Sequence, residues 1–310
     1  MIVIGSRGSQ LALWQARYIA GLLTELGEET RLEIIKTTGD KIQDVPLAQV
    51  GGKGLFTKEI EEALLDRRID LAVHSLKDMP AEVPEGLAIT AIPEREDPRD
   101  ALLGSPLGPG MRVGTSSLRR SAQLNALGIG IKIEMLRGNV DTRIRKLDEG
   151  QYDAIVLAAA GLRRLGLADR IRETLPVEVM CPAVGQGALA IETRCDSGHA
   201  EAIARRLDHA ETRAIVTAER ALLATLGGGC QVPIGGHAVL LDGVVHLRAI
   251  VATPDGSRII RGELSGSDPS AVGAALGATL LDQGAREILR EVYLEGGPPG
   301  PHPAPSPASA

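Results

Sequence analysis

The stretch "MIVIGSRGSQLALWQARYIAGLLTEL", residues 1–26, decides the fold because a short apolar run stands directly before a helical pattern. "MIVIG" predicts a buried β-strand. The residues after it predict an amphipathic helix from about Leu11 to Leu26, with Ser9 or a neighbour as its N-cap. A strand that leads into a helix is typical of a βαβ unit.

The same alternation continues to about residue 80. "RLEIIKTTGD", residues 31–40, predicts a second strand, and "LFTKEIEEALLDRR", residues 55–68, predicts a helix with apolar residues three and four apart. "IDLAVHS", residues 69–75, predicts a third strand, which "KDMP" closes. These elements together predict a first lobe of the α/β class.

A second lobe is expected after "PEREDP", residues 93–98, a charged segment bounded by prolines that we interpret as a crossing. "MRVGTSSLRRSAQLNAL", residues 111–127, predicts a strand entering a helix. "IKIEMLRGNVDTRIRKLDEG", residues 131–150, and "YDAIVLAAAGLRRLG", residues 152–166, repeat that order. The chain is therefore expected to form two successive α/β lobes.

The C-terminal part has a different pattern. After "PAVGQGALAIETR", a helix from about Ala210 to Leu226 is expected to end at Gly227. Residues 236–264 contain apolar runs separated by Asp-Gly turns, which predict hairpins of a small antiparallel sheet. One helix, roughly residues 271–293, is expected to cover that sheet. The final residues 295–310 are rich in Pro, Gly, Ser and Ala and are expected to be disordered.

Length and composition limit the function classes. A chain of 310 residues with 44% hydrophobic residues is long enough for two or three cores. The formal net charge of -6 argues against a nucleic-acid binder held by general electrostatics. Neither a signal-peptide pattern nor a membrane-length apolar window is found, so a cytoplasmic protein without membrane contact is expected.

The three cysteines are an odd number without C-x-x-C spacing, which indicates neither a disulfide framework nor a zinc site. A reducing compartment fits best, and no metal site is expected. Cys181 and Cys195 are expected to be buried as small hydrophobic residues. His74 has no partner at ligand spacing and is expected to pack at the end of its strand.

Cationic side chains recur beside small hydroxyl or glycine residues where strands turn into helices. In open α/β sheets such turns lie at the carboxyl ends of the strands, where ligand crevices form. A single arginine there is most often solvated, but five similar turns favour one convergent site for carboxylates. The turns contribute Arg7 and Ser9, Lys53, Ser75 and Lys77, Arg119 and Arg120, and Arg137 and Arg143.

Nucleotide binding is not favoured. "VGGKGLFT" lacks the spacing of a P-loop, and "VGQGALA" has only a fragment of the dinucleotide glycine pattern. Any anionic ligand of this acidic protein must instead be held by local positive charge.

Asp78 follows Lys77 at the end of the third strand, where Pro80 prevents a simple helical continuation. It is either an ordinary turn or cap residue, or a carboxylate in the cationic cleft that transfers protons or stabilises a cation. The residues alone leave both readings open.

Cys230 lies in the loop "GGGCQVPIG", residues 227–235, whose glycines give little steric shielding. Such a position suits a covalent attachment point. The preceding helix C-terminus disfavours a thiolate, because that end of the dipole is negative. A reacting Cys230 therefore needs a strong electrophile or an activating group.

Seven motifs, in this order, resemble the hydroxymethylbilane synthase family, also called porphobilinogen deaminase. They are "GSRGSQLALWQA", "GGKGLFTKEIE", "HSLKDMP", "VGTSSLRR", "RGNVDTR", "PAVGQGALAIE" and "GGGCQVPIG", within a similarity from about Ile2 to Leu264. The resemblance implies a transferase that joins four porphobilinogen molecules into the linear tetrapyrrole hydroxymethylbilane and releases ammonia. It also implies a dipyrromethane cofactor held by a thioether.

By this resemblance Cys230 attaches the cofactor and Asp78 is the catalytic carboxylate. Phe56 either stacks on a pyrrole or has a plain core role. The matching positions that would bind cofactor and substrate carboxylates are Arg7, Ser9, Lys53, Ser75, Lys77, Thr115, Ser116, Ser117, Arg119, Arg120, Arg137, Arg143 and Gln186.

The resemblance implies two α/β lobes like a type II periplasmic binding protein. A small C-terminal α+β domain with an antiparallel three-stranded sheet carries the cysteine loop. The expected divisions are 1–95 with a return segment 190–205, then 96–189, 206–294 and a disordered tail 295–310. Porphobilinogen is the expected substrate, and hand-over of hydroxymethylbilane to uroporphyrinogen-III synthase and a monomeric state are further expectations.

Two other classes of function stay open on the residues alone. A non-catalytic two-lobe binding protein for a small carboxylate would explain the lobes and the cationic turns, but it leaves Cys230 and Asp78 without a purpose. A cysteine-dependent hydrolase would need a base near Cys230, and His237 is the nearest histidine in the sequence.

Overall fold

The first strand and helix form where the sequence predicts them. In the computed structural model, which describes residues 1–41, 54–227 and 232–294, β1 is Ile2–Ser6 and α1 is Gln10–Glu25. The Ser9 hydroxyl accepts a hydrogen bond from the backbone N–H of Ala12, which satisfies one of the open donors of the first helical turn. The N-cap prediction is confirmed.

The first sheet has five strands in the order β2-β1-β3-β10-β4. Strands β2 and β3 pair with β1 in parallel, whereas β10 pairs with β3 and β4 in antiparallel register. Helices α1 and α4 pack on this sheet through separate apolar clusters. The elements not yet given are β2 Thr30–Ile34, α2 Thr38–Lys41, α4 Lys58–Leu65, β3 Leu71–Ser75, β4 Leu87–Ala91, β10 Leu189–Arg194 and α8 His199–Arg205.

The second sheet also has five strands, in the order β7-β6-β8-β5-β9. Its central strands β6 and β8 are parallel, and β5 runs antiparallel beside β8. Its strands are β5 Asp100–Gly104, β6 Arg112–Gly114, β7 Lys132–Glu134, β8 Ala154–Ala158 and β9 Glu173–Thr174. Its helices are α5 Leu118–Asn125, α6 Val140–Asp148 and α7 Ala159–Arg164.

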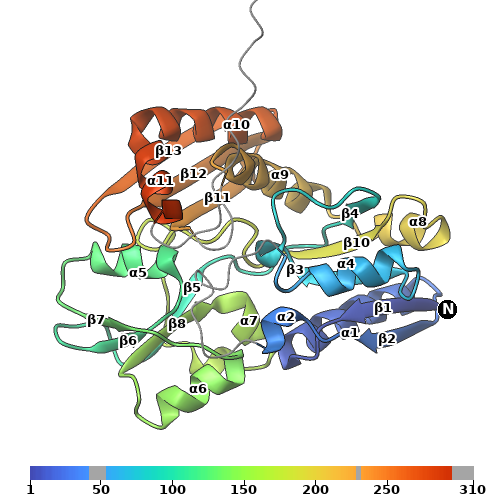
Figure 1. The fold of residues 1–310 in the computed structure, drawn as a ribbon, viewed down its shortest axis with the longest axis horizontal. Coiled ribbons are helices and arrows are strands. Elements are labelled where there is room, and N and C mark those ends of the chain that lie inside the picture. Colours follow the sequence, from blue (N-terminus) through green and yellow to red (C-terminus); the bar gives the residue numbers. More distant parts are fainter. Residues whose placement is uncertain (42–53, 228–231, 295–310) are drawn as a thin grey trace, which may run out of the picture.

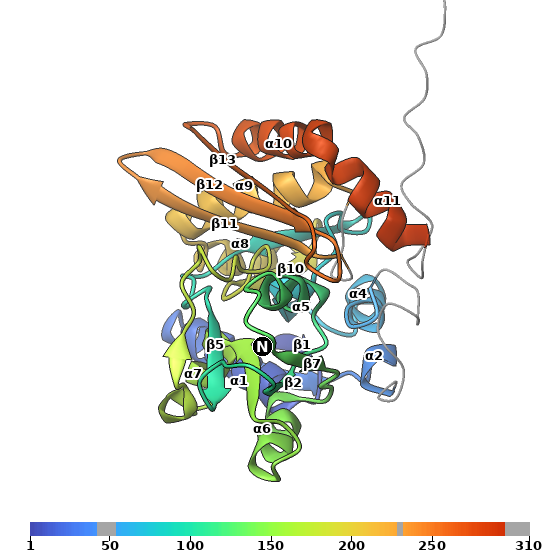
Figure 2. The same ribbon diagram turned by 90° about the vertical axis from the view of Figure 1, so that its left-hand side faces the viewer.

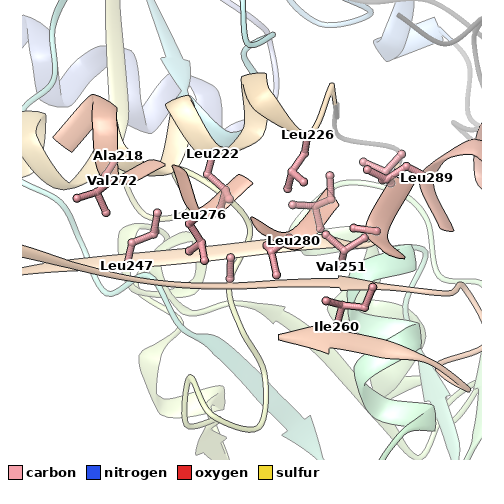
Figure 3. Close-up of a cluster of buried hydrophobic side chains, with 14 of the residues drawn as sticks. Ala218, Leu222, Leu226, Leu247, Val251, Ile260, Val272, Leu276, Leu280 and Leu289 are labelled. Carbon is pink, nitrogen blue, oxygen red and sulfur yellow. The ribbon is translucent and has the colours of Figure 1, made fainter. Parts of the chain in front are cut away.

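The third sheet is antiparallel, in the order β11-β12-β13, and lies above the other two in Figure 1 and again in the turned view of Figure 2. Leu222, Leu247 and Leu276 join its helices and strands in one apolar core (Figure 3). The elements are α9 Ala210–Thr225, β11 Ile234–Leu241, β12 Val244–Ala252, β13 Ile259–Gly266, α10 Pro269–Leu280 and α11 Arg286–Leu294. The α/β class, the hairpins and the three-stranded sheet are confirmed.

The single helix expected at residues 271–293 is wrong. The chain leaves α10 through residues 281–285. Gly284 has a φ of 104°, which lies outside the right-handed helical region. Glycine reaches this left-handed region without the steric cost that other residues meet. The break lets α11 turn away from the direction of α10 (Figure 2).

Three segments of the chain meet at the buried carboxylate of Glu219 on α9. Arg95 of the crossing segment donates to both carboxylate oxygens, at 2.7 and 3.1 Å. The backbone N–H groups of Gly185 and Ala238 donate to the same carboxylate at 2.7 and 2.9 Å. Glu219 thereby fixes the crossing, the segment before β10 and the strand β11 to one another. In the part of the chain described, no helix is long and apolar enough to cross a membrane.

Candidate active site

Asp78 lies at the end of a single 3-10 turn, Leu76–Asp78, directly after β3. The turn is fixed at both ends, because Leu76 donates its N–H to the carbonyl of Ala188 and Met79 donates to the carbonyl of Leu76. Ser75 accepts a hydrogen bond from Gln15 Nε2 of α1 at 2.8 Å. These hydrogen bonds therefore fix the backbone that carries the half-buried carboxylate of Asp78.

Lys77 is half-buried and lies within the field of several charges. Burial, with the nearby cations Arg120 and Arg119, lowers the pKa of Lys77 to about 8, although Asp78 and Asp100 oppose this effect. Lys77 Nζ lies 3.5 Å from Gln186 Oε1. The carboxylates near Lys77 thus compensate its positive environment only in part.

Arg119 and Arg120 share the carboxylate of Asp100. Arg119 Nη1 donates to Oδ2 and Arg120 Nη2 donates to Oδ1, each at 2.7 Å, and all three side chains are buried. Burial alone would raise the pKa of Asp100, but the two guanidinium groups lower it well below its ordinary value. Two cations on one carboxylate leave the cluster with a net positive charge.

Gln186 connects this cluster to Lys77. Its Nε2 donates to Asp100 Oδ1 at 2.9 Å and to the carbonyl of Pro98 at 2.7 Å, while its Oε1 lies toward Lys77 Nζ. The predicted site residues of β3 and α5 are therefore brought together through a buried acid that sequence reasoning missed. "PRDALLG" contains no motif or spacing that distinguishes Asp100 from an ordinary strand residue.

Arg143 on α6 and Arg137 in the loop before it lie near the same cluster, because Arg120 and Asp78 act on Arg143. Burial and the cations Arg120 and Arg137 lower the pKa of Arg143 to about 10, and Asp78 opposes them. Arg143 Nε donates to the carbonyl of Gly138 at 2.7 Å. Arg137 Nη1 is buried and has no hydrogen-bond partner among the described residues. Such a buried donor is complementary to an anionic ligand.

The hydroxyl residues mainly fix the backbone. Ser117 caps α5 by accepting from the N–H of Arg120, and Thr115 accepts from the N–H of Ser117. Ser116 donates to the carbonyl of Leu136 at 2.8 Å. These bonds hold the turn that aims the arginines of α5, and Ser9 does the same for α1.

Arg7 and Phe56 contact each other. The guanidinium carbon of Arg7 lies 4.1 Å from the centre of the Phe56 ring, a cation–π arrangement. The ring also packs so closely on Gly39 that a Cβ there would come within 2.1 Å of a ring carbon. Phe56 is half-buried, so both the stacking and the packing predictions stay open.

Two predicted site residues, Lys53 and Cys230, lie outside the described residues, as does the tail at residues 295–310. Cys181 is buried as expected, and burial raises the pKa of its thiol to about 12. The expectation for Cys195 is wrong. It is exposed because it follows β10 in the turn at the edge of the first lobe. His74 packs as expected, buried, with its Nε2 3.0 Å from Glu192 Oε2.

Comparison with solved structures finds solute-binding proteins at low identity and with low TM-scores. One is the second substrate binding domain of a putative amino acid ABC transporter from Streptococcus pneumoniae Canada MDR_19A. It is 13% identical with a TM-score of 0.41, over 73% of this chain and 95% of that one. Another is a periplasmic substrate-binding protein of an ABC transporter from Coxiella burnetii, 14% identical with a TM-score of 0.40, over 71% and 97%.

Comparison with protein families gives matches over most of the chain. Residues 2–202 match the model described as porphobilinogen deaminase, dipyromethane cofactor binding domain, and residues 214–282 match the porphobilinogen deaminase C-terminal domain. A protein of Syntrophobacter fumaroxidans named porphobilinogen deaminase is 52% identical over 303 residues, which are 94% of this chain and 98% of that protein. The chain therefore belongs to the porphobilinogen deaminase family.

Proposed function

We propose that this chain joins four porphobilinogen molecules head to tail, with Asp78 as the catalytic carboxylate and Cys230 as the attachment point of the cofactor. The chain is a transferase of tetrapyrrole biosynthesis that forms hydroxymethylbilane and releases ammonia. The assignment of the site rests on the position of Asp78, whose carboxylate lies within a cluster of side chains with surplus positive charge.

The cluster matches the chemistry of the substrate. Each porphobilinogen carries an acetate and a propionate, so a growing chain accumulates carboxylates. Guanidinium groups bind carboxylates through two parallel hydrogen bonds, and Arg137 has an unpaired buried donor to offer. The acidic protein thus concentrates positive charge where an anionic product is built.

The same residues fit the dipyrromethane cofactor of the family. When bound, this group supplies a covalently held primer for elongation. Its pyrroles carry the same carboxylates as the substrate, so we assign their binding to Lys77, Arg137 and Arg143, with Arg119 and Arg120 behind them. Because the latter two already share Asp100, their contribution is mainly the positive field that their charges create.

Asp78 acts on the reacting pyrrole. Loss of ammonia from the aminomethyl carbon of porphobilinogen leaves an azafulvene, whose protonated form is a delocalised cation. A carboxylate held beside the pyrrole accepts its N–H and stabilises that positive charge. The 3-10 turn keeps the carboxylate in place before the substrate arrives, so little reorganisation accompanies the reaction.

The other function classes lack such support. A binding protein without activity does not explain why a carboxylate stands among the cations that would hold its ligand. For the hydrolase, His237 lies on β11, and burial lowers the pKa of its imidazole, with Glu219 and Arg95 among the charges around it. This histidine belongs to the surroundings of the Glu219 connection.

We also propose that the chain divides at the positions expected from the sequence, into 1–95 with 190–205, then 96–189 and 206–294. The membership of β10 in the first sheet supports the return segment. A cytoplasmic location, a monomeric state and hand-over of the product to uroporphyrinogen-III synthase are parts of the same proposal.

The role of Asp78 is tested by the D78N substitution, which removes the charge and keeps the shape. We expect the turnover number for porphobilinogen to fall by about a hundredfold or more while the thermal midpoint stays close to that of the wild type. Asp66→Asn, at an exposed helix end, is the matched control. Near-normal turnover by D78N would remove Asp78 from the catalytic role.

The role of Cys230 is tested by peptide mass spectrometry. The peptide that contains Cys230 should carry the mass of two deaminated porphobilinogen units, and Cys230→Ser should lack it. Unmodified wild-type protein that consumes porphobilinogen at full rate would contradict the attachment while leaving the transferase activity intact.

A further inference from the structure

A pocket of about 310 Å³ lies outside the site described above, where α9 packs against the first sheet. Its walls come from the segment after Asp78, from β4 and the residue that follows it, from α9, and from the start of α10. None of its lining residues belongs to the cationic cluster around Asp78. The size is at the lower end of the range for ligand pockets, about 300–1,000 Å³.

Two arginines of α9 reach this pocket, and their partners differ. Arg213 is neutralised, because it forms an ion pair with Asp208 at 2.6 Å and also donates to the carbonyls of Ile89 and Thr90. Arg220 donates only to carbonyls, through Nη2 to Pro80 at 2.9 Å and to Ala81 at 2.8 Å. Among the described residues, no carboxylate lies within ion-pair distance of Arg220.

The charge of Arg220 is thus uncompensated in a half-buried position. Burial lowers its pKa, and within the described part of the chain no acid opposes that effect. A guanidinium has five N–H donors, and the Nε and Nη1 groups of Arg220 donate to no described protein atom. A partly buried cation with open donors is complementary to an anion.

The remaining walls decide what kind of anion fits. Ala81, Ile89, Ile92, Val216 and Ala221 make most of the remaining wall apolar, and Ser270 at the start of α10 adds a hydroxyl. A fully hydrated inorganic anion gains nothing from such walls, whereas an aliphatic chain is removed from water by them. The Thr217 hydroxyl already donates to the carbonyl of Arg213, so it competes little with Arg220 for the ligand.

We propose that this pocket binds a small organic carboxylate with a short aliphatic chain, whose carboxylate pairs with Arg220 and whose chain contacts the apolar walls. The site is separate from the cationic cluster and its existence does not depend on the proposed catalytic roles. Because Arg220 holds the carbonyls of residues 80 and 81, an occupant contacts the backbone that leads away from Asp78.

The test is an amide NMR titration of the full-length protein with butyrate, and with butyramide as the neutral analogue of the same shape. We expect saturable shifts of the Ala81 and Ala221 resonances with butyrate alone. Arg220→Met should weaken this binding by about tenfold or more, since a charge-assisted hydrogen-bonded pair is lost. Arg143→Met, which changes only the cationic cluster, should leave the shifts at Ala81 and Ala221 in place.

A second variant covers the case in which Arg220→Met does not fold. Ala224→Phe keeps Arg220 and places a ring from an exposed wall position into the pocket, so it should abolish the butyrate shifts. The proposal is overturned if butyramide binds as well as butyrate, or if Arg220→Met or Ala224→Phe binds as the wild type does. Tighter binding of inorganic phosphate than of butyrate would overturn the assigned ligand class.

Discussion

Two buried carboxylates join parts of this molecule, and their charge balance differs. Glu219 accepts hydrogen bonds from both Nη groups of Arg95 and from two backbone N–H groups. The ion pair is neutral, and both carboxylate oxygens have partners within the protein. Asp100 receives two guanidinium groups, from Arg119 and Arg120, and an amide from Gln186. One cluster is electrically complete, whereas the other keeps a positive charge.

The difference separates a structural connection from a receptor for anions. A buried charge is tolerated when it is paired, and the neutral Glu219 cluster satisfies that condition without a ligand. The Asp100 cluster satisfies the hydrogen bonding of its acid but not the charge of its arginines. Burial is the main cause of the lowered pKa values of Lys77 and Arg143, and the neighbouring arginines add to it. A bound row of carboxylates would relieve this positive charge.

The largest expected effect is on folding, in Asp100→Asn. Two buried guanidinium groups lose the counter-charge that they share, so the free energy of unfolding should fall by about 3–5 kcal/mol. Glu219→Gln should cost less than Asp100→Asn, because one arginine is affected and glutamine still accepts hydrogen bonds. Urea unfolding followed by circular dichroism measures both.

The control for this prediction is Asp148→Asn, whose carboxylate pairs with Arg170 at the surface and should matter little. If Asp100→Asn unfolds no more easily than Asp148→Asn, the two buried arginines do not depend on Asp100 to compensate their charge. If Glu219→Gln costs more than Asp100→Asn, the comparison between the two clusters is reversed.

The sequence predicted some elements of this fold and missed others. The strand-helix alternation predicted β1, α1, β3 and β8, because each has its apolar pattern within one segment. It missed β5 and β4, whose short apolar runs do not lead into helices, and it did not assign β10 as a strand, because the partners of β10 lie about a hundred residues earlier. The break at Gly284 was missed because a single glycine within an apolar helix pattern is tolerated.

Some of the site residues could likewise be predicted from the sequence, and others could not. The cationic turns could be predicted from residue type and position, and in the structure the charge of Arg120 acts on both Lys77 and Arg143. Asp100 could not be predicted, because its role depends on β5 lying beside the start of α5. The pocket residue Arg220 had no signal either, since it differs from Arg213 only in having no acid beside it among the described residues.

An intermediate effect is expected from Arg143→Met, which removes charge from the positive cluster without removing a counter-charge. The free energy of unfolding should stay equal or rise slightly, because Arg120 and Arg137 no longer repel a third cation. The KM for porphobilinogen should rise by about tenfold or more through loss of a carboxylate partner. Steady-state kinetics on protein whose cofactor content is checked by intact mass measures this.

The matched control for Arg143 lies on the same helix. Arg145 is exposed and pairs with Glu149 one turn later, so Arg145→Met should leave the KM unchanged. A KM increase of equal size in both variants would show that α6 contributes only general charge. A marked loss of stability in Arg143→Met alone would place Arg143 with the structural connections.

The smallest expected effect is a change of KM and of stability with pH, caused by the titration of Lys77. Its pKa of about 8 in the folded protein lies below the ordinary value of 10.5, so the folded state disfavours the charged ammonium. The resulting stability penalty is fully present below about pH 8 and disappears as the pH rises toward 10.5. Substrate binding responds in the opposite direction, because raising the pH through about 8 removes a positive charge from the site. The KM for porphobilinogen should therefore rise between about pH 7 and pH 9 while stability increases.

Lys77→Arg distinguishes this titration from changes in the substrate, since arginine stays protonated throughout that range. The variant should show a flatter KM profile than the wild type over the same pH values. An identical rise in both proteins would assign the pH dependence to another group. A wild-type KM that is constant across this range would mean that burial and the neighbouring arginines do not bring the pKa of Lys77 down to about 8.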